Sequence, residues 1–145
     1  MSKKNNWEYS PALESTDHIQ LKDQYNLFIN GEFSAPKSGK YFKTINPANE
    51  KTIAKIAEAG QSDVDYAVAS AKKAYEKIWS KMPRKERGKY IYRIARLLQE
   101  RAREFSVIET MDGGKPIRES RDVDIPLSAA HFFYYAGWAD KLEYA

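Results

Sequence analysis

The sequence predicts an α/β fold in which a small β-meander is followed by three long helices. Between positions 25 and 57, short segments rich in β-branched and aromatic residues alternate with turn residues, as strands do. From about residue 62 onward, apolar residues recur at the spacing of three and four that marks one face of a helix. The 145-residue length suits one domain, and 42% hydrophobic with 30% charged residues is ordinary for a globular protein.

The β segment is predicted to open with a hairpin between Tyr25 and Phe33. Its turn is Asn30-Gly31, a pair that suits a type I′ turn because both central residues need positive φ. Residues 41–45 and 52–57 are predicted strands, joined by a turn at residues 46–49.

The residues that precede this β segment, 1–24, carry no convincing periodicity. Their polar composition and the Ser10-Pro11 pair predict an extended or disordered arm. The folded domain is therefore expected to run from 25 to 145.

Each predicted helix has its own boundary signals. Ser62 is the candidate cap of the first helix, and Pro83 ends that helix and can begin the second. Gly113-Gly114 is expected to stop the second helix. The third is predicted from about Asp124, a candidate cap followed by Pro126, to residue 142.

Composition excludes several functions. There is no cysteine, so a disulfide framework, a thiolate nucleophile and a cysteine-based zinc site are all absent. The two histidines, His18 and His131, have no neighbouring Ser and Asp set, and each is expected to be a surface or packing residue. No apolar run reaches the roughly 20 residues of a membrane span, and the start lacks a secretory signal, so we expect a cytoplasmic protein.

Positive charge is concentrated in one predicted helix. Nine Lys and Arg residues lie between positions 81 and 103, opposed by only Glu86 and Glu100. Such a block could bind nucleic acid. The apolar stripe Ile91, Ile94 and Leu98 favours a solvated basic face on an amphipathic helix instead, so nucleic acid is not the expected partner.

Four stretches of the chain together resemble the N-terminal region of the NAD(P)-dependent aldehyde dehydrogenase family. The resemblance runs from about Tyr25 to the last residue. It is carried by the order and spacing of residues 27–32 with 44–48, residues 63–79, the helix from Glu86 that ends in 109–116, and residues 134–141. One local departure is Leu142-Glu143-Tyr144-Ala145, where many members have a glycine.

The resemblance implies an N-terminal part of the aldehyde dehydrogenase fold with an incomplete nucleotide-binding domain. The remainder of that polypeptide would then be a partner, covering the aromatic helix around residues 132–138. Family members form dimers or tetramers, oxidise an aldehyde to a carboxylate through a cysteine thiolate, and use NAD or NADP. The cysteine, the activating glutamate and the dinucleotide-binding residues of the family all lie beyond the matched region, so the resemblance assigns no catalytic or cofactor-binding residue here.

Two kinds of site residue can still be transferred from the family. Some members bind a monovalent cation through backbone carbonyls and one carboxylate, and those positions fall on Thr44, Ile45 and Asp112. Leu127 falls where a side chain of the substrate tunnel would be. We therefore expect an aldehyde dehydrogenase segment that is inactive by itself. The alternatives are a non-catalytic subunit that completes a separate catalytic chain, and a basic-helix module that binds nucleic acid.

Overall fold

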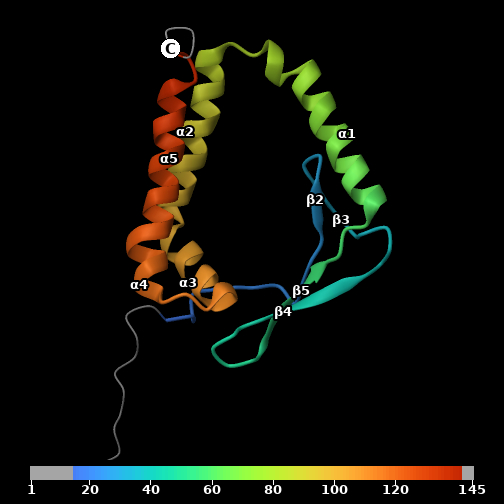
Figure 1. The fold of residues 1–145 in the computed structure, drawn as a ribbon, viewed down its shortest axis with the longest axis vertical. Helices are drawn as coiled ribbons and strands as arrows, with labels where there is room; N and C mark the ends of the chain where they lie inside the picture. The colour runs from blue at the N-terminus through green and yellow to red at the C-terminus, as the bar shows by residue number, and fades with distance from the viewer. Residues whose placement is uncertain (1–14, 142–145) are drawn as a thin grey trace, which may run out of the picture.

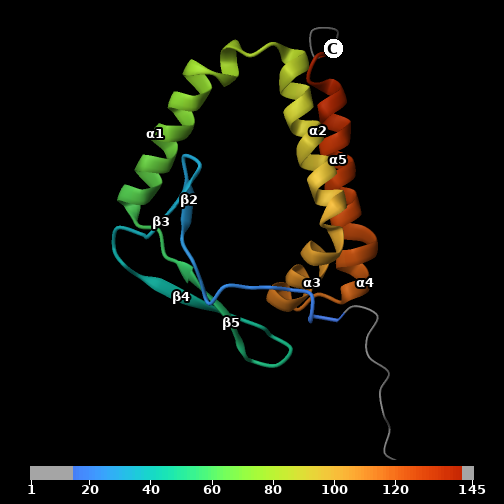
Figure 2. The same ribbon diagram turned by 180° about the vertical axis from the view of Figure 1, so that it is seen from behind.

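The computed structural model describes residues 15–141, which form an open arch (Figures 1 and 2). One side of the arch holds the strands and helix α1 (Gln61–Lys77). The other side is the antiparallel pair α2 (Arg84–Glu100) and α5 (Ile125–Trp138). A short 3₁₀ turn, η1 (Trp79–Lys81), lies between the two sides at one end of the arch. This arrangement confirms the α/β class.

The strands form two separate units rather than the single meander that the sequence predicts. A three-stranded sheet has the order β1 (Gln24–Tyr25), β5 (Thr52–Ala57), β4 (Tyr41–Ile45). In it β4 pairs with β5 antiparallel, as expected, but β1 pairs with β5 in parallel. The meander prediction was therefore wrong about which strands pair. Strand β1 lies beside β5, a strand about thirty residues later in the sequence, and a local residue pattern does not specify such a distant partner.

The second unit is the predicted hairpin, and its turn is confirmed. Strand β2 (Leu27–Ile29) pairs antiparallel with β3 (Glu32–Ser34). Asn30 and Gly31 have φ values of 57° and 84°, the positive values that a type I′ turn needs.

Helix α1 starts one residue earlier than its predicted cap. The cap position is Gly60, and Ser62 already lies inside the helix. The capping carboxylate belongs to Asp63, whose Oδ2 accepts a hydrogen bond from the Gly60 N–H at 2.9 Å. Its Oδ1 also accepts from the Lys37 N–H at 3.2 Å, so this buried side chain ties the loop before β4 to the start of α1.

The second predicted helix is divided in two at Arg101. Helix α2 ends there, and α3 (Ala102–Gly113) continues in a new direction. Arg101 leaves helical geometry, with φ −107° and ψ 18°, although no glycine or proline marks the break. The expected stop at the far end is confirmed, because Gly114 adopts φ +70° and caps α3.

The third predicted helix begins before Asp124. Helix α4 (Ile117–Glu119) runs through a π-helical turn, η2 (Ser120–Asp124), directly into α5. Asp124 therefore has helical backbone angles and is not the cap; Pro116 precedes the first turn. The expectation of three long helices is corrected to α1, α2, α3 and the α4–η2–α5 helix.

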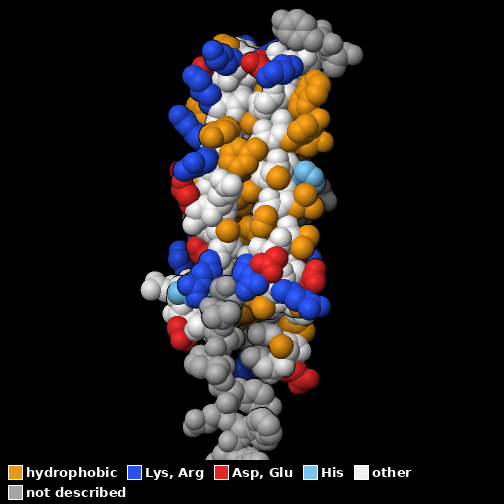
Figure 3. Space-filling model, turned by 90° about the vertical axis from the view of Figure 1, so that its left-hand side faces the viewer, with side chains coloured by type: hydrophobic (Ala, Val, Ile, Leu, Met, Phe, Trp, Pro, Cys, Tyr) orange, Lys and Arg blue, Asp and Glu red, His pale blue; other side chains and the backbone are white. Residues whose placement is uncertain are grey.

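The buried core of the described residues is small. The buried hydrophobic residues are Ala54, Ala57, Ala95, Val107 and Ala129. Many larger apolar side chains of α1, α2 and α5 are exposed, and on the outer face of the α2–α5 pair they gather beside a column of Lys and Arg side chains (Figure 3). Among residues 15–141, no helix combines the length and apolar character needed to cross a membrane.

Candidate functional site

The end of strand β4 meets the end of helix α3, and this junction contains the predicted cation-site residues. The Thr44 hydroxyl donates a hydrogen bond to Oδ1 of Asp112, although 68 positions separate the two residues. The β4–β5 register shifts between Thr44 and Ile45, an irregularity that redirects the backbone there. Ile45 follows directly in the strand, and its side chain is half exposed.

A close contact between loop and helix end holds this junction together. Gly114 follows α3, and Pro47 follows β4. A Cβ placed on Gly114 would lie 2.6 Å from Cγ of Pro47, so the Gly114 backbone can lie this close to the proline ring only because the residue is glycine.

An apolar groove of about 480 Å³ opens beside the junction. The ring of Phe42 and the side chains of Ile53 and Ile108 line it, and Thr44 and Asp112 supply its polar edge. Its lining therefore combines apolar surface with a single carboxylate.

Leu127, the predicted tunnel residue, lies in the first turn of α5, 15 positions after Asp112. Its side chain is 51% exposed, so the described residues leave about half of it uncovered. Tyr134, Tyr135 and Trp138 are exposed farther along the same helix. Leu127 is not among the residues that line the groove beside Thr44 and Asp112.

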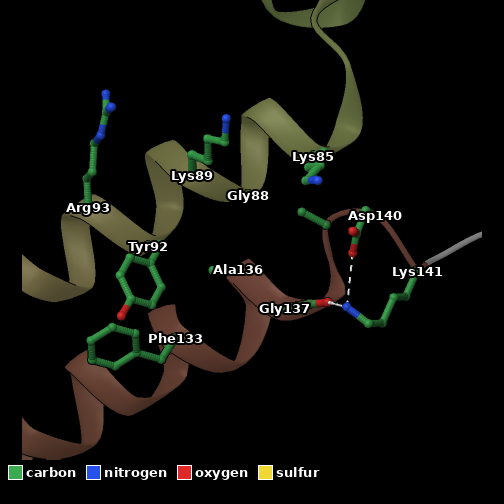
Figure 4. Close-up of a pocket in the computed structure, with 11 residues that line it drawn as sticks. Lys85, Gly88, Lys89, Tyr92, Arg93, Phe133, Ala136, Gly137, Asp140 and Lys141 are labelled. Atoms are coloured by element: carbon green, nitrogen blue, oxygen red, sulfur yellow. Dashed lines mark hydrogen bonds and ion pairs between the residues drawn. The ribbon is translucent and has the colours of Figure 1, made fainter.

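A third place is the groove between α2 and α5, of about 510 Å³ (Figure 4). The rings of Tyr92 and Phe133 meet edge to face across it, 5.0 Å apart. Lys89 and Arg93 extend to the side of α2 that points away from α5 (Figure 4). Lys89 pairs with Glu86 at 2.7 Å, and both side chains are about half exposed.

Charged pairs elsewhere perturb several pKa values. A hydrogen bond to Asp124 raises the pKa of Lys115, whose Nζ lies 2.5 Å from the carboxylate. This pair connects the loop after α3 to the last residue of the π turn. The hydrogen bonds from Arg101 lower the pKa of Glu104.

Groups suited to catalysis do not converge in the described part of the chain. Residues 15–141 contain no group of three or more His, Cys, Asp or Glu side chains placed to hold a metal ion. His18 and His131 are both exposed and lie on different elements. The whole sequence also lacks a glycine-rich turn of the dinucleotide or phosphate type.

One buried polar cluster was not predicted from the sequence. Ser106 and Ser120 are almost completely buried, and the Thr110 hydroxyl donates to Oγ of Ser120 at 3.2 Å. Ser106 also donates to the carbonyl of Ala102, four residues earlier, at 2.7 Å. The cluster joins α3 to the π turn. Serine and threonine occur both on the exposed face of an amphipathic helix and in buried hydrogen bonds, so the sequence did not indicate that these residues are buried.

Comparison with known proteins places this fold in a family. The sequence model of the aldehyde dehydrogenase family matches residues 33–145. An aldehyde dehydrogenase of Alternaria alternata is 42% identical over 134 residues, covering 92% of this chain and 27% of the relative. Human mitochondrial 10-formyltetrahydrofolate dehydrogenase is 40% identical over 131 residues, covering 90% of this chain and 14% of the relative.

Solved structures agree with the sequence relatives. The NAD⁺ complex of an aldehyde dehydrogenase from Bacillus cereus superposes with a TM-score of 0.80 at 38% identity, covering 86% of this chain and 27% of that one. The chain therefore belongs to the aldehyde dehydrogenase family and corresponds to its N-terminal portion. It spans 14% to 28% of the length of the curated relatives compared.

Proposed function

We propose that this chain acts as the N-terminal segment of an NAD-linked aldehyde dehydrogenase and has no turnover by itself. Family membership, together with the likeness to structures solved with NAD⁺, supports this function. The reaction needs a nucleophile that adds to the aldehyde carbon and a bound acceptor for the hydride. The chain contains no cysteine and no dinucleotide-binding turn. NAD is favoured as the cofactor of the whole enzyme, and NADP is the alternative.

The test is a turnover assay on the purified 145-residue chain. We expect no NADH absorbance above buffer with NAD⁺ and a panel of aldehydes, while a full-length aldehyde dehydrogenase provides the positive control. Titration with NAD⁺ in a calorimeter is expected to show no binding heat. Turnover that coelutes with the chain, scales with its concentration and disappears on heating would disprove inactivity.

The uncovered apolar surface favours one further possibility, that the chain completes a separate catalytic chain. Tyr134, Tyr135 and Trp138 on α5 and Val68 and Tyr75 on α1 are all more than a third exposed. Exposed patches of this kind are characteristic of interfaces. Purification from the source cells distinguishes these two functions. A larger, cysteine-bearing partner that coelutes with the chain supports a separate subunit, and the absence of such a partner supports a segment of one long polypeptide. We propose that this long polypeptide assembles as a homo-oligomer.

We also propose that Thr44, Ile45 and Asp112 contribute to a monovalent cation site. Sodium and potassium ions prefer hard oxygen ligands, and the backbone carbonyls at the end of β4 with the Asp112 carboxylate would supply them. The hydrogen bond between Thr44 and Asp112 supports this grouping. Potassium is expected to raise the melting temperature of the wild type but not of Asp112→Asn, with Asp122→Asn as the control. Equal responses in all three proteins would count against the site.

Leu127 is proposed to line the aldehyde channel of the assembled enzyme. Its position on α5 and its half-exposed side chain support this role. In an active assembly, Leu127→Phe is expected to lower kcat/KM for bulky aldehydes more than for short ones, because a larger ring narrows the channel. An equal change for all aldehydes would indicate an effect on folding instead.

A further inference from the structure

We infer that Asn30, at the tip of the β2–β3 hairpin, is a modification site whose side-chain amide converts spontaneously to a mixture of aspartate and isoaspartate. The residue is exposed, and Gly31 follows it. This inference concerns the chemistry of the hairpin and does not depend on the proposed enzymatic function.

The reaction needs only water. The backbone nitrogen of Gly31 attacks Cγ of Asn30, a new C–N bond forms, and the side-chain nitrogen leaves as ammonia. The resulting succinimide is opened by water at either ring carbonyl, which yields aspartate or isoaspartate without oxidation or reduction. Gly31 makes the attack easy because it has no Cβ to shield the nitrogen.

The local structure leaves room for this chemistry. A Cβ at Gly31 would meet no atom within 4 Å, so the space around the attacking residue is open. A type I′ turn does not itself align the nitrogen with Cγ, so the hairpin must open first. Opening is accessible because β2 and β3 pair only with each other among the described strands, and isolated two-stranded hairpins are marginally stable.

The other described asparagines are protected, and they form a matched internal control. The side chains of Asn26, Asn46 and Asn49 each accept a hydrogen bond, at 2.8 to 3.0 Å. Asn46 also precedes Pro47, which has no N–H to attack with. Within residues 15–141, Asn30 is the asparagine whose side chain makes no hydrogen bond.

Modification would change how the hairpin meets α1. The tip lies beside this helix (Figures 1 and 2), and Asn30 lines a small cavity of about 230 Å³ with Ala67, Ser70 and Ala74. Aspartate places a negative charge there and lowers the formal net charge by one from +4. Isoaspartate adds an atom to the backbone, so the two-residue turn can no longer close in the same register.

The experiment is incubation of the whole chain at mildly alkaline and mildly acidic pH, followed by peptide mapping and by enzymatic methylation of isoaspartate. We expect conversion at Asn30 that is faster at alkaline pH and within about ten-fold of the rate in a peptide of residues 24–36. Asn26, Asn46 and Asn49 are expected to stay intact, and Asn30→Gln to lose the isoaspartate signal in the mapped peptide that contains position 30. The inference is overturned if the peptide converts while the chain does not, or if Asn49 converts as fast as Asn30.

Discussion

At the scale of single residues, Gly114 and Asp63 each connect segments that are distant in sequence. Gly114 reverses the chain after α3 with φ +70° and contacts Pro47. Asp63 caps α1 and also accepts a hydrogen bond from the loop before β4. The glycine stop could be predicted because positive φ favours glycine. The capping role of Asp63 was missed, because Ser62 is an equally good local candidate.

Replacing Gly114 with alanine is expected to destabilise the chain by about 1–3 kcal/mol, through backbone strain and a clash with Pro47. Gly137→Ala is the matched control. Its Cβ would meet nothing within 4 Å near the C-terminal end of α5, so it is expected to stabilise by at most about 1 kcal/mol. Urea unfolding measures both. Equal midpoints for the two variants would contradict the role given to the Pro47 contact.

The Arg101–Glu104 pair predicts a pH effect on stability. Arg101 lowers the pKa of Glu104 in the folded chain. Because the pKa of Glu104 is lower in the folded chain than in the unfolded chain, the pair contributes its full stabilisation above the ordinary pKa of glutamate, near pH 4.3. This stabilisation is lost as the pH falls through the lower pKa of the folded chain. Glu104→Gln is therefore expected to reduce the acid sensitivity of the melting temperature. Glu58→Gln serves as the control. If it reduced the acid sensitivity of the melting temperature by the same amount, the effect could not be assigned to the Arg101–Glu104 pair.

At the scale of elements, the close packing of α2 against α5 depends on a small residue. A Cβ on Gly88 would lie 2.9 Å from the carbonyl oxygen of Ala136 and 3.4 Å from Cβ of Ala139. Because backbone atoms of α5 occupy that space, a side chain at this position must separate the helices.

Gly88→Val is therefore expected to destabilise the chain by about 1–3 kcal/mol and to weaken the contact between Tyr92 and Phe133. Urea unfolding gives the first quantity, and the nuclear Overhauser effect between the two rings gives the second. Gly137→Val, in open space on α5, controls for the intrinsic cost of valine in a helix. A retained ring contact in Gly88→Val would show that the helices do not depend on this glycine.

The elements also differ in how far local sequence specifies them. Strands β4 and β5 were predicted with their observed bounds, because β-branched and aromatic residues are bracketed by turn residues. The break at Arg101 and the π turn at residues 120–124 were not predicted. The π turn has a contact between elements, that of Thr110 with Ser120, which the local sequence does not reveal. The apolar period of residues 91–108 continues across Arg101, so the pattern gives no sign of the break.

At the scale of the whole molecule, the arch leaves much apolar surface open. We expect the isolated chain to bind the dye ANS and to self-associate, because exposed patches of large apolar residues drive both. Sedimentation velocity and dye fluorescence measure these properties. A partner that covers α1 and α5 should suppress both signals. A monodisperse chain without dye binding would mean that these faces are not interaction surfaces.

The sequence by itself determined the family, the α/β class and the Asn30-Gly31 turn, since each depends on residue types at short or fixed spacing. Only the tertiary structure decided that β1 runs parallel beside β5 and that Thr44 contacts Asp112. Long-range pairing of this kind depends on how whole elements pack. Periodicity shows which face of a helix or strand is apolar, but not which partner covers it.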